Sequence, residues 1–201
     1  LDIGANIGYY AIMQLKIIGD RGKLIAVEPS KSNIELLKKN LKLNGFNKVE
    51  IHNKAVSNII GKRILYLSDM SNLNTFHKPT HSNNLNLSGK TLEVETITVE
   101  KLINKKFDLN LIRMDVEGHE VEILDGMIPF IKKSKSKPMI VFETHLSRYS
   151  KNHNFENTLK NLFKLGYHFK IVGSSSKRGT KLIEQKGYAS KEIIRSDDEE
   201  R

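Results

Sequence analysis

Short apolar runs alternate along the chain with stretches in which apolar residues recur every three or four positions. The short runs predict buried strands, and the recurring pattern predicts amphipathic helices. The predicted strands span residues 1–3, 23–27, 49–52, 108–115, 138–143 and 167–172. The predicted helices span residues 7–18, 30–44, 119–127 and 155–165. Nearly continuous apolar strands that alternate with helices indicate an α/β fold, with a mostly parallel central sheet and helices on both faces.

One segment interrupts this alternation. Two β-like runs, residues 62–67 and 91–99, flank a polar stretch at about 68–90 in which nine of 23 residues are Ser or Asn. So long a stretch inside a compact domain is usually functional or disordered. We therefore expect a single domain over residues 1–195 with this polar insertion, and an acidic tail over 196–201. Because residues 1–3 already have the pattern of a buried strand end, we also expect the N-terminal part of the domain to be truncated.

The strongest functional signal is the segment Leu-Asp-Ile-Gly-Ala-Asn-Ile-Gly at residues 1–8. It predicts a strand, a glycine-containing turn and the start of a helix, which is where nucleotide-like cofactors bind in an open α/β sheet. Gly4 and Gly8 allow a ligand to approach the backbone closely. Glu28 follows Gly8 by twenty residues, at the end of the second predicted strand. An acidic side chain there can accept hydrogen bonds from both ribose hydroxyls of an adenosine.

Two side chains near this turn discriminate between adenosine cofactors. The dinucleotide fingerprint has glycine where this chain has Asn6, and Asp2 places a carboxylate beside the turn. A pyrophosphate needs bare N–H groups and is repelled by a nearby anion. S-adenosylmethionine carries an ammonium and a sulfonium but no phosphate, so the same carboxylate attracts it. The turn therefore favours S-adenosylmethionine over NAD, and an NAD-linked oxidoreductase is the weaker alternative.

A second group of polar residues stands at the ends of the fourth and fifth predicted strands. Asp115 and Glu117 alternate onto one side, and Glu143 and His145 follow the next strand. Ligands of open α/β sheets bind at this carboxyl edge, so these four residues are the candidate catalytic residues. A hydroxyl acceptor needs a base to remove its proton, and the sequence leaves open which of the four supplies it. The alternative is structural, since an acid such as Glu117 also favours the start of the following helix.

Several segments resemble, in the same order, the FkbM family of methyltransferases. They are residues 2–10, 27–29, 40–45, 53–57, 96–99, 114–120 and 141–143, with Asp-Val-Glu-Gly at 115–118 the most specific part. The resemblance implies a Rossmann-like class I methyltransferase fold, S-adenosylmethionine as cofactor and, commonly in this family, O-methylation of a small-molecule or sugar hydroxyl. Together with the turn, it gives the predicted cofactor-binding residues: Asp2, Gly4, Asn6, Gly8, Glu28, Pro29, Ala55, Val56 and Asp115.

The amino-acid composition limits which metal sites and which methyl acceptors are plausible. The 201 residues include no cysteine, which excludes disulfides and thiolate metal sites. The formal net charge of +10 points toward nucleic acid, so an RNA methyltransferase is the main alternative function. However, residues 115–118 do not match the tetrapeptide typical of base methylation, and acidic residues at the mouth of the site would repel phosphates. We therefore expect a small-molecule or glycan acceptor and no nucleic-acid partner.

Two further expectations concern location and metal binding. No apolar run approaches the roughly 20 residues needed to span a bilayer, so we expect no membrane span and a cytoplasmic protein. His77 and His81 are four residues apart in the polar stretch, but Pro79 lies between them and breaks a helix. We interpret both as solvated loop histidines and expect no metal site.

Overall fold

The computed structural model describes residues 1–78, 87–103, 108–145, 148–174 and 190–192. The chain divides into two compact units, Leu1–Thr158 and Leu159–Arg201. The predicted acidic tail, His81 and the rest of residues 79–86 lie outside the described residues. Within the described part of the chain, no helix has the length and hydrophobicity that crossing a bilayer requires.

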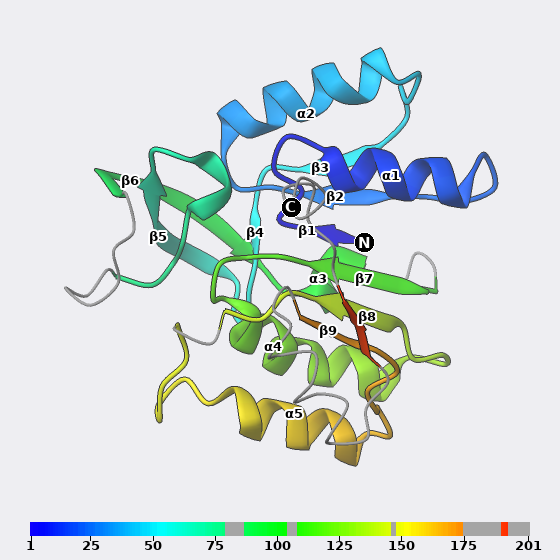
Figure 1. The fold of residues 1–201 in the computed structure, drawn as a ribbon, viewed down its shortest axis with the longest axis vertical. Coiled ribbons are helices and arrows are strands. Elements are labelled where there is room, and N and C mark those ends of the chain that lie inside the picture. The colour runs from blue at the N-terminus through cyan, green and yellow to red at the C-terminus, as the bar shows by residue number, and fades with distance from the viewer. Residues whose placement is uncertain (79–86, 104–107, 146–147, 175–189, 193–201) are drawn as a thin grey trace, which may run out of the picture. The chain divides into compact units, whose positions relative to one another are not determined.

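A five-stranded parallel sheet forms the centre of the first unit (Figure 1). Its strands are β1 (Asp2–Ile3), β2 (Ile25–Val27), β3 (Glu50–His52), β7 (Leu111–Met114) and β8 (Met139–Phe142), in the order β3-β2-β1-β7-β8. Ile3 of β1 is opposite Val27 of β2 on one side and Met114 of β7 on the other. Because all five strands run in the same direction, the turns after β1, β2 and β7 meet at one edge, where ligands bind in sheets of this kind.

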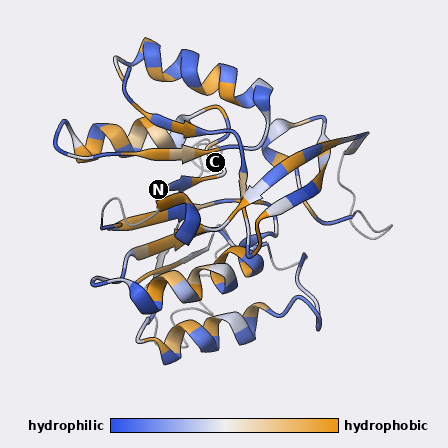
Figure 2. Cartoon of the chain, turned by 180° about the vertical axis from the view of Figure 1, so that it is seen from behind, coloured by the Kyte–Doolittle hydropathy of each residue, from blue (hydrophilic) through white to orange (hydrophobic). Residues whose placement is uncertain are grey.

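The helices of this unit bury their apolar residues. They are α1 (Tyr9–Ile18), α2 (Lys31–Leu43), α3 (Val99–Ile103) and α4 (Glu120–Lys133). Leu15 of α1 and Leu37 and Leu41 of α2 share one buried cluster with Ala26 of β2. α4 lies toward the β7–β8 end of the sheet (Figure 1), and apolar and polar residues alternate as stripes along α2 and α4 (Figure 2). The predicted Rossmann-like α/β fold is confirmed.

α4 is longer than the sequence predicts. The expected helix ends near Gly126, yet α4 continues to Lys133 because Met127 and Ile131 extend its buried face. Gly126 is not a helix cap here. A Cβ at this position would lie 2.6 Å from Asn58 Cα, so the glycine instead permits close packing of α4 on the segment after β4 (Ala55–Val56).

The two β-like runs that flank the polar stretch form a hairpin. β5 (Gly61–Ser68) pairs antiparallel with β6 (Leu87–Ile97), and β4 adds in parallel to β6, which gives a three-stranded sheet in the order β4-β6-β5. After β5, the short 3-10 helix η1 (Ser71–Leu73) leads to Thr75, which forms an isolated bridge with Tyr66. The described beginning of the predicted insertion is therefore ordered against β5.

The C-terminal strand differs from the prediction. The sixth strand is expected at 167–172, but β9 spans Val172–Ser174 and pairs in parallel with β10 (Ser190–Glu192). α5 (Phe155–Lys164) precedes it, and Phe169 packs its ring edge-on against Phe163 of this helix, 5.3 Å between centroids. The aromatic residues that suggest a strand at 167–172 thus include one that packs on a helix.

The turn after β1 is packed directly against the end of β7. Gly4 has φ +77, and a Cβ added there would lie 2.2 Å from the backbone oxygen of Asp115. We expect Gly4→Ala to lower the free energy of unfolding by roughly 2–3 kcal/mol, from left-handed strain and overpacking. Gly45→Ala is the matched control, since Gly45 has φ +81 but open space around it. Urea unfolding monitored by circular dichroism should show a loss of only about 1 kcal/mol for Gly45→Ala, and equal losses would contradict the packing role of Gly4.

Candidate active site

A cavity of about 410 Å³ opens where the turns after β1, β2 and β7 meet β4 and the segment after η1. This volume is within the roughly 300–1,000 Å³ typical of small-molecule sites. Eight predicted site residues line it: Gly4, Asn6, Glu28, Pro29, Ala55, Val56, Asp115 and Glu117. The structure therefore brings most predicted cofactor-binding residues and two predicted catalytic residues around one space.

Four predicted site residues do not line this cavity: Asp2, Gly8, Glu143 and His145. Gly8 is the left-handed N-cap of α1, and a Cβ there would lie 2.5 Å from Leu37 Cδ1, so it serves helix packing. Glu143 is exposed just beyond β8. Glu143 and His145 nevertheless remain near the cavity wall, because their polar atoms lie within 4.8 Å of a carboxylate oxygen of Asp115.

The Glu28 carboxylate holds the cofactor turn in shape. Its Oε2 accepts a hydrogen bond from the backbone N–H of Asn6 (3.0 Å), and its Oε1 accepts from the backbone N–H of Ser30 (3.0 Å) and from Asn33 Nδ2 (3.1 Å). The side chain is only 4% exposed, and burial raises its pKa even though these hydrogen bonds oppose the shift. A carboxylate has about four acceptor positions. Among the described residues three are used, which leaves one on Oε2.

Asp2 lies beneath the cavity rather than in it. It is fully buried, and burial raises its pKa despite the Arg113 guanidinium 3.3 Å away. Arg113 connects this buried acid to the cavity, since its other terminal nitrogen lies 3.0 Å from Asp115 Oδ2. The same guanidinium stacks over the ring of Tyr10 at 4.1 Å. Asp2 thus acts on the cavity through Arg113, which it helps to position.

Three carboxylates, those of Asp115, Glu117 and Glu120, lie close to the ring of His145. Its Nδ1 donates to Glu120 Oε1 at 2.8 Å, and its Nε2 lies 3.4 Å from Glu117 Oε1 and 3.9 Å from Asp115 Oδ1. Burial alone would lower the pKa of His145, but the hydrogen bonds with Glu117 and Glu120 outweigh it and raise the pKa to about 10. At neutral pH the ring is therefore an imidazolium, which holds a proton and cannot accept one.

Glu120 is the buried anchor of this arrangement. Its carboxylate, fully buried, also accepts from Tyr149 Oη at 2.9 Å and from the backbone N–H of Gly118 at 3.3 Å. Burial would raise the pKa of Glu120, but the hydrogen bond from His145 dominates and the pKa is lowered. Glu120 and His145 thus form a charged pair that fixes the position of the imidazolium beside the cavity.

The turn that carries Glu117 is held by its backbone. Glu117 has φ +51, which a residue with a side chain rarely adopts. Its carbonyl accepts from Thr75 Oγ1 at 2.8 Å, and the next carbonyl, of Gly118, accepts from the rings of His77 (2.8 Å) and His153 (2.9 Å). His77 is consequently partly buried against this turn, in contrast to the solvated histidine that the sequence suggests.

Comparison with known families decides the class of this site. The family model described as Methyltransferase FkbM domain matches residues 2–169, which include every residue that lines the cavity. The chain belongs to the FkbM methyltransferase family. It is therefore an enzyme that transfers methyl groups, as the glycine turn and the Asp-Val-Glu-Gly segment predict. No curated protein and no solved structure matches this FkbM chain.

Several residues that shape the site of this FkbM methyltransferase were not singled out from the sequence. Arg113 lies within an otherwise apolar strand. The sequence feature that could have pointed to it is its spacing of two residues from Asp115, which places both on the same face of the strand. Glu120 lies at the end of the family-like segment 114–120, where nothing in the local pattern marks it as a buried acid. Tyr149 and His119 reach the site through tertiary contacts, since His119 bonds Ser57 Oγ, 62 residues earlier, at 3.1 Å.

Proposed function

We propose that this FkbM methyltransferase uses S-adenosylmethionine to methylate a hydroxyl group of a small molecule or a sugar. The observation that carries the proposal is the acidic lining of the cavity, where the carboxylate of Glu28 follows β2 and those of Asp115 and Glu117 follow β7, on the two sides of β1. Bound S-adenosylmethionine would supply a methyl group on a positively charged sulfur, which such a lining attracts.

The residues around the cavity fit that cofactor. Among the described residues, the lysine and arginine side chains that line it are Lys54 and Arg113, and both are paired with acids: Lys54 with Glu95, and Arg113 with Asp2 and Asp115. Acids therefore already balance much of their positive charge, which argues against binding of the pyrophosphate of NAD. The remaining acceptor position on Glu28 Oε2 suits one ribose hydroxyl, and Ala55 and Val56 offer an apolar wall for an adenine.

We assign Asp115 as the general base that takes the proton from the acceptor hydroxyl. Burial raises its pKa, with Arg113 opposing, so it is a stronger base than an ordinary carboxylate. Its Oδ2 accepts a hydrogen bond from Arg113, and its Oδ1, 3.9 Å from His145 Nε2, is the oxygen we assign to the proton. Glu117 instead faces the imidazolium of His145. That positive charge partly opposes the rise in the pKa of Asp115, and it would stabilise negative charge that develops on an acceptor oxygen.

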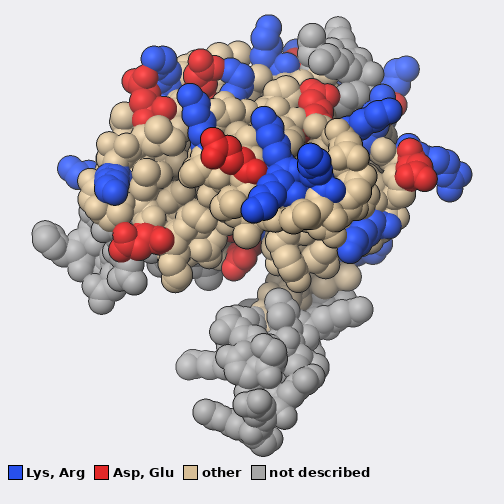
Figure 3. Space-filling view, turned by 90° about the horizontal axis from the view of Figure 1, so that it is seen from above, with Lys and Arg blue, Asp and Glu red and all other residues tan. Residues whose placement is uncertain are grey.

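A nucleic-acid acceptor is supported less well. Figure 3 shows the molecule from above. On that face, acidic side chains lie among the lysines and arginines, so the basic side chains do not form one continuous surface. The net charge of +10 is therefore consistent with a lysine-rich surface, while the acidic cavity itself would repel a phosphate backbone.

The test of the proton role is Asp115→Asn. We expect methyl transfer to a hydroxyl acceptor to slow by about 10²–10⁴-fold, the usual contribution of a general base. The measurement is transfer of a radiolabelled methyl group to a panel of sugars and small alcohols. The matched control is Asp108→Asn, which changes an exposed acid that precedes β7. Full activity of Asp115→Asn would remove this residue from the mechanism, and labelling of RNA alone would refute the proposed acceptor class.

A further inference from the structure

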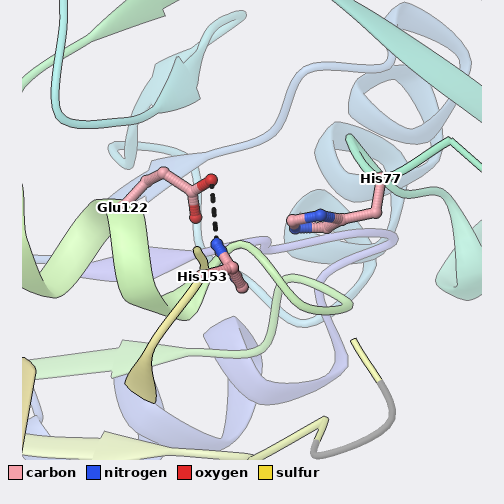
Figure 4. Close-up of side chains that lie close together, drawn as sticks. All are labelled: His77, Glu122 and His153. Carbon is pink, nitrogen blue, oxygen red and sulfur yellow. Dashed lines mark ion pairs between the residues drawn. The ribbon is translucent and has the colours of Figure 1, made fainter. Parts of the chain in front are cut away.

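Outside the cavity, three side chains from separate segments converge (Figure 4). His77 follows η1, Glu122 is in the first turn of α4, and His153 precedes α5. All three are partly buried, and each offers one ligand atom within 4.8 Å of the others. Two imidazoles and one carboxylate are a ligand set that zinc accepts in proteins.

The backbone of Gly118 determines which nitrogen of each ring carries a proton. His77 Nε2 lies 2.8 Å, and His153 Nε2 2.9 Å, from the Gly118 carbonyl oxygen. A carbonyl only accepts, so the proton of each neutral ring is on Nε2 and the lone pair is on Nδ1. Metal-binding histidines commonly donate their other ring N–H to a backbone carbonyl in this way.

The spacing of Glu122 and His153 fits an ion between them. Glu122 Oε1 and His153 Nδ1 are 3.4 Å apart, beyond the roughly 2.7–3.2 Å of a well-formed hydrogen bond. Two ligands on a tetrahedral zinc ion, each bound at about 2.0–2.1 Å, are about 3.3 Å apart. The observed separation, which is also that of a direct ion pair, would accommodate two ligands on one cation with little movement of either side chain.

The fully buried His119 orients the carboxylate of Glu122. His119 is 1% exposed, and its Nε2 faces Arg63 Nη1 at 3.3 Å. Arginine can only donate, so the proton of the His119 ring is on Nδ1, which points toward Glu122 Oε2 at 3.4 Å. Both of these buried atoms lack a hydrogen-bond partner among the described residues. The arrangement orients Oε2 toward His119 and Oε1 toward His153.

We propose that His77, Glu122 and His153 bind a divalent transition-metal cation, with zinc the best match to two imidazoles and one carboxylate. Such an ion would join three segments, the one after η1, the start of α4 and the one before α5. Because Phe76, Glu117 and His119 next to these ligands line the cavity, the ion would stabilise one of its walls. The fourth tetrahedral position would be open to water.

Zinc binding by the chelator-treated full chain tests the site without reference to methyl transfer. Calorimetry with zinc chloride should give one site, and Glu122→Gln and His153→Ala should each weaken it at least 10-fold. Zinc should also raise the melting temperature of the wild type but not of Glu122→Gln, an isosteric change that preserves packing. His52→Ala is the matched control, because His52 also pairs with a carboxylate, Glu50 at 2.7 Å, but the described residues offer it no third ligand.

Three results would overturn the proposal. They are no zinc bound by the wild type, zinc binding that Glu122→Gln leaves unchanged, and a loss in His52→Ala as large as that in His153→Ala. Cobalt substitution gives a second measurement, since a tetrahedral site with two imidazoles should produce visible absorption that disappears in Glu122→Gln.

Discussion

Replacing Glu120 by Ala is expected to lower the free energy of unfolding by about 3–5 kcal/mol, the range seen when one partner of a buried ion pair is removed. The carboxylate is fully buried and accepts hydrogen bonds from His145, Tyr149 and the backbone of Gly118. Without it, the imidazolium loses its closest counter-charge, and the Tyr149 hydroxyl and the buried N–H of Gly118 lose their acceptor. Urea unfolding followed by circular dichroism measures the effect.

A surface pair provides the control for this change. Glu100 accepts from Lys133 at 2.7 Å, but the two side chains are 44% and 68% exposed. Glu100→Ala should therefore cost less than about 1 kcal/mol. Equal losses for Glu100→Ala and Glu120→Ala would contradict the special role of the buried pair.

The same pair makes stability depend on pH in a defined direction. The pKa of His145 is raised to about 10 in the folded chain, against about 6.5 when unfolded. Its stabilisation is therefore complete below pH ~6.5 and is lost as the pH rises toward 10. We expect the wild type to lose on the order of 3 kcal/mol between pH 7 and pH 10 relative to Glu120→Ala. If the free energy of unfolding depends on pH in the same way in both proteins, Glu120 does not raise the pKa of His145.

Replacing Glu28 by Ala is expected to weaken binding of S-adenosylmethionine by roughly 10- to 100-fold. This is the effect of losing one hydrogen bond from a ribose hydroxyl to a charged acceptor, about 1.5–3 kcal/mol. The sequence alone suggests contacts with both hydroxyls, but three of the carboxylate's acceptor positions are already used within the protein. Calorimetric titration with the cofactor measures the change.

The control separates cofactor contact from loss of local structure. Asn33→Ala removes one of the three protein contacts of Glu28 but leaves its carboxylate in the cavity wall. We expect its affinity for S-adenosylmethionine to stay within about 3-fold of the wild type, since the lost hydrogen bond joins two protein groups and stabilises the fold, not the bound cofactor. If Asn33→Ala weakens binding as much as Glu28→Ala, Glu28 acts by shaping the turn and not by touching the ribose.

The sequence predicts the central sheet and its cofactor turn well because both depend on local pattern. The apolar strands, the glycines after β1 and the acid after β2 are each readable within a few residues. The position of an acid relative to the cavity is not local. Asp2 lies in β1 and Glu28 directly follows the neighbouring β2, yet Asp2 is buried beside Arg113 while Glu28 lines the cavity.

The state of His145 could not be predicted for the same reason. Its sequence neighbourhood gives an ordinary imidazole and hence a plausible base. The folded chain surrounds it with Glu117 and Glu120, which keep it protonated. Likewise, His153 and Glu122 are 31 positions apart in sequence, and only the packing of α4 against the segment before α5 brings them to 3.4 Å.

Calorimetric titration of the wild-type chain with S-adenosylmethionine, S-adenosylhomocysteine and NAD tests the central claim most directly. The acidic cavity and its paired basic residues predict that both adenosyl amino acids bind with one-to-one stoichiometry and that NAD gives no heat. Binding of NAD without binding of either adenosyl compound would contradict the assignment of S-adenosylmethionine as the cofactor of this FkbM methyltransferase.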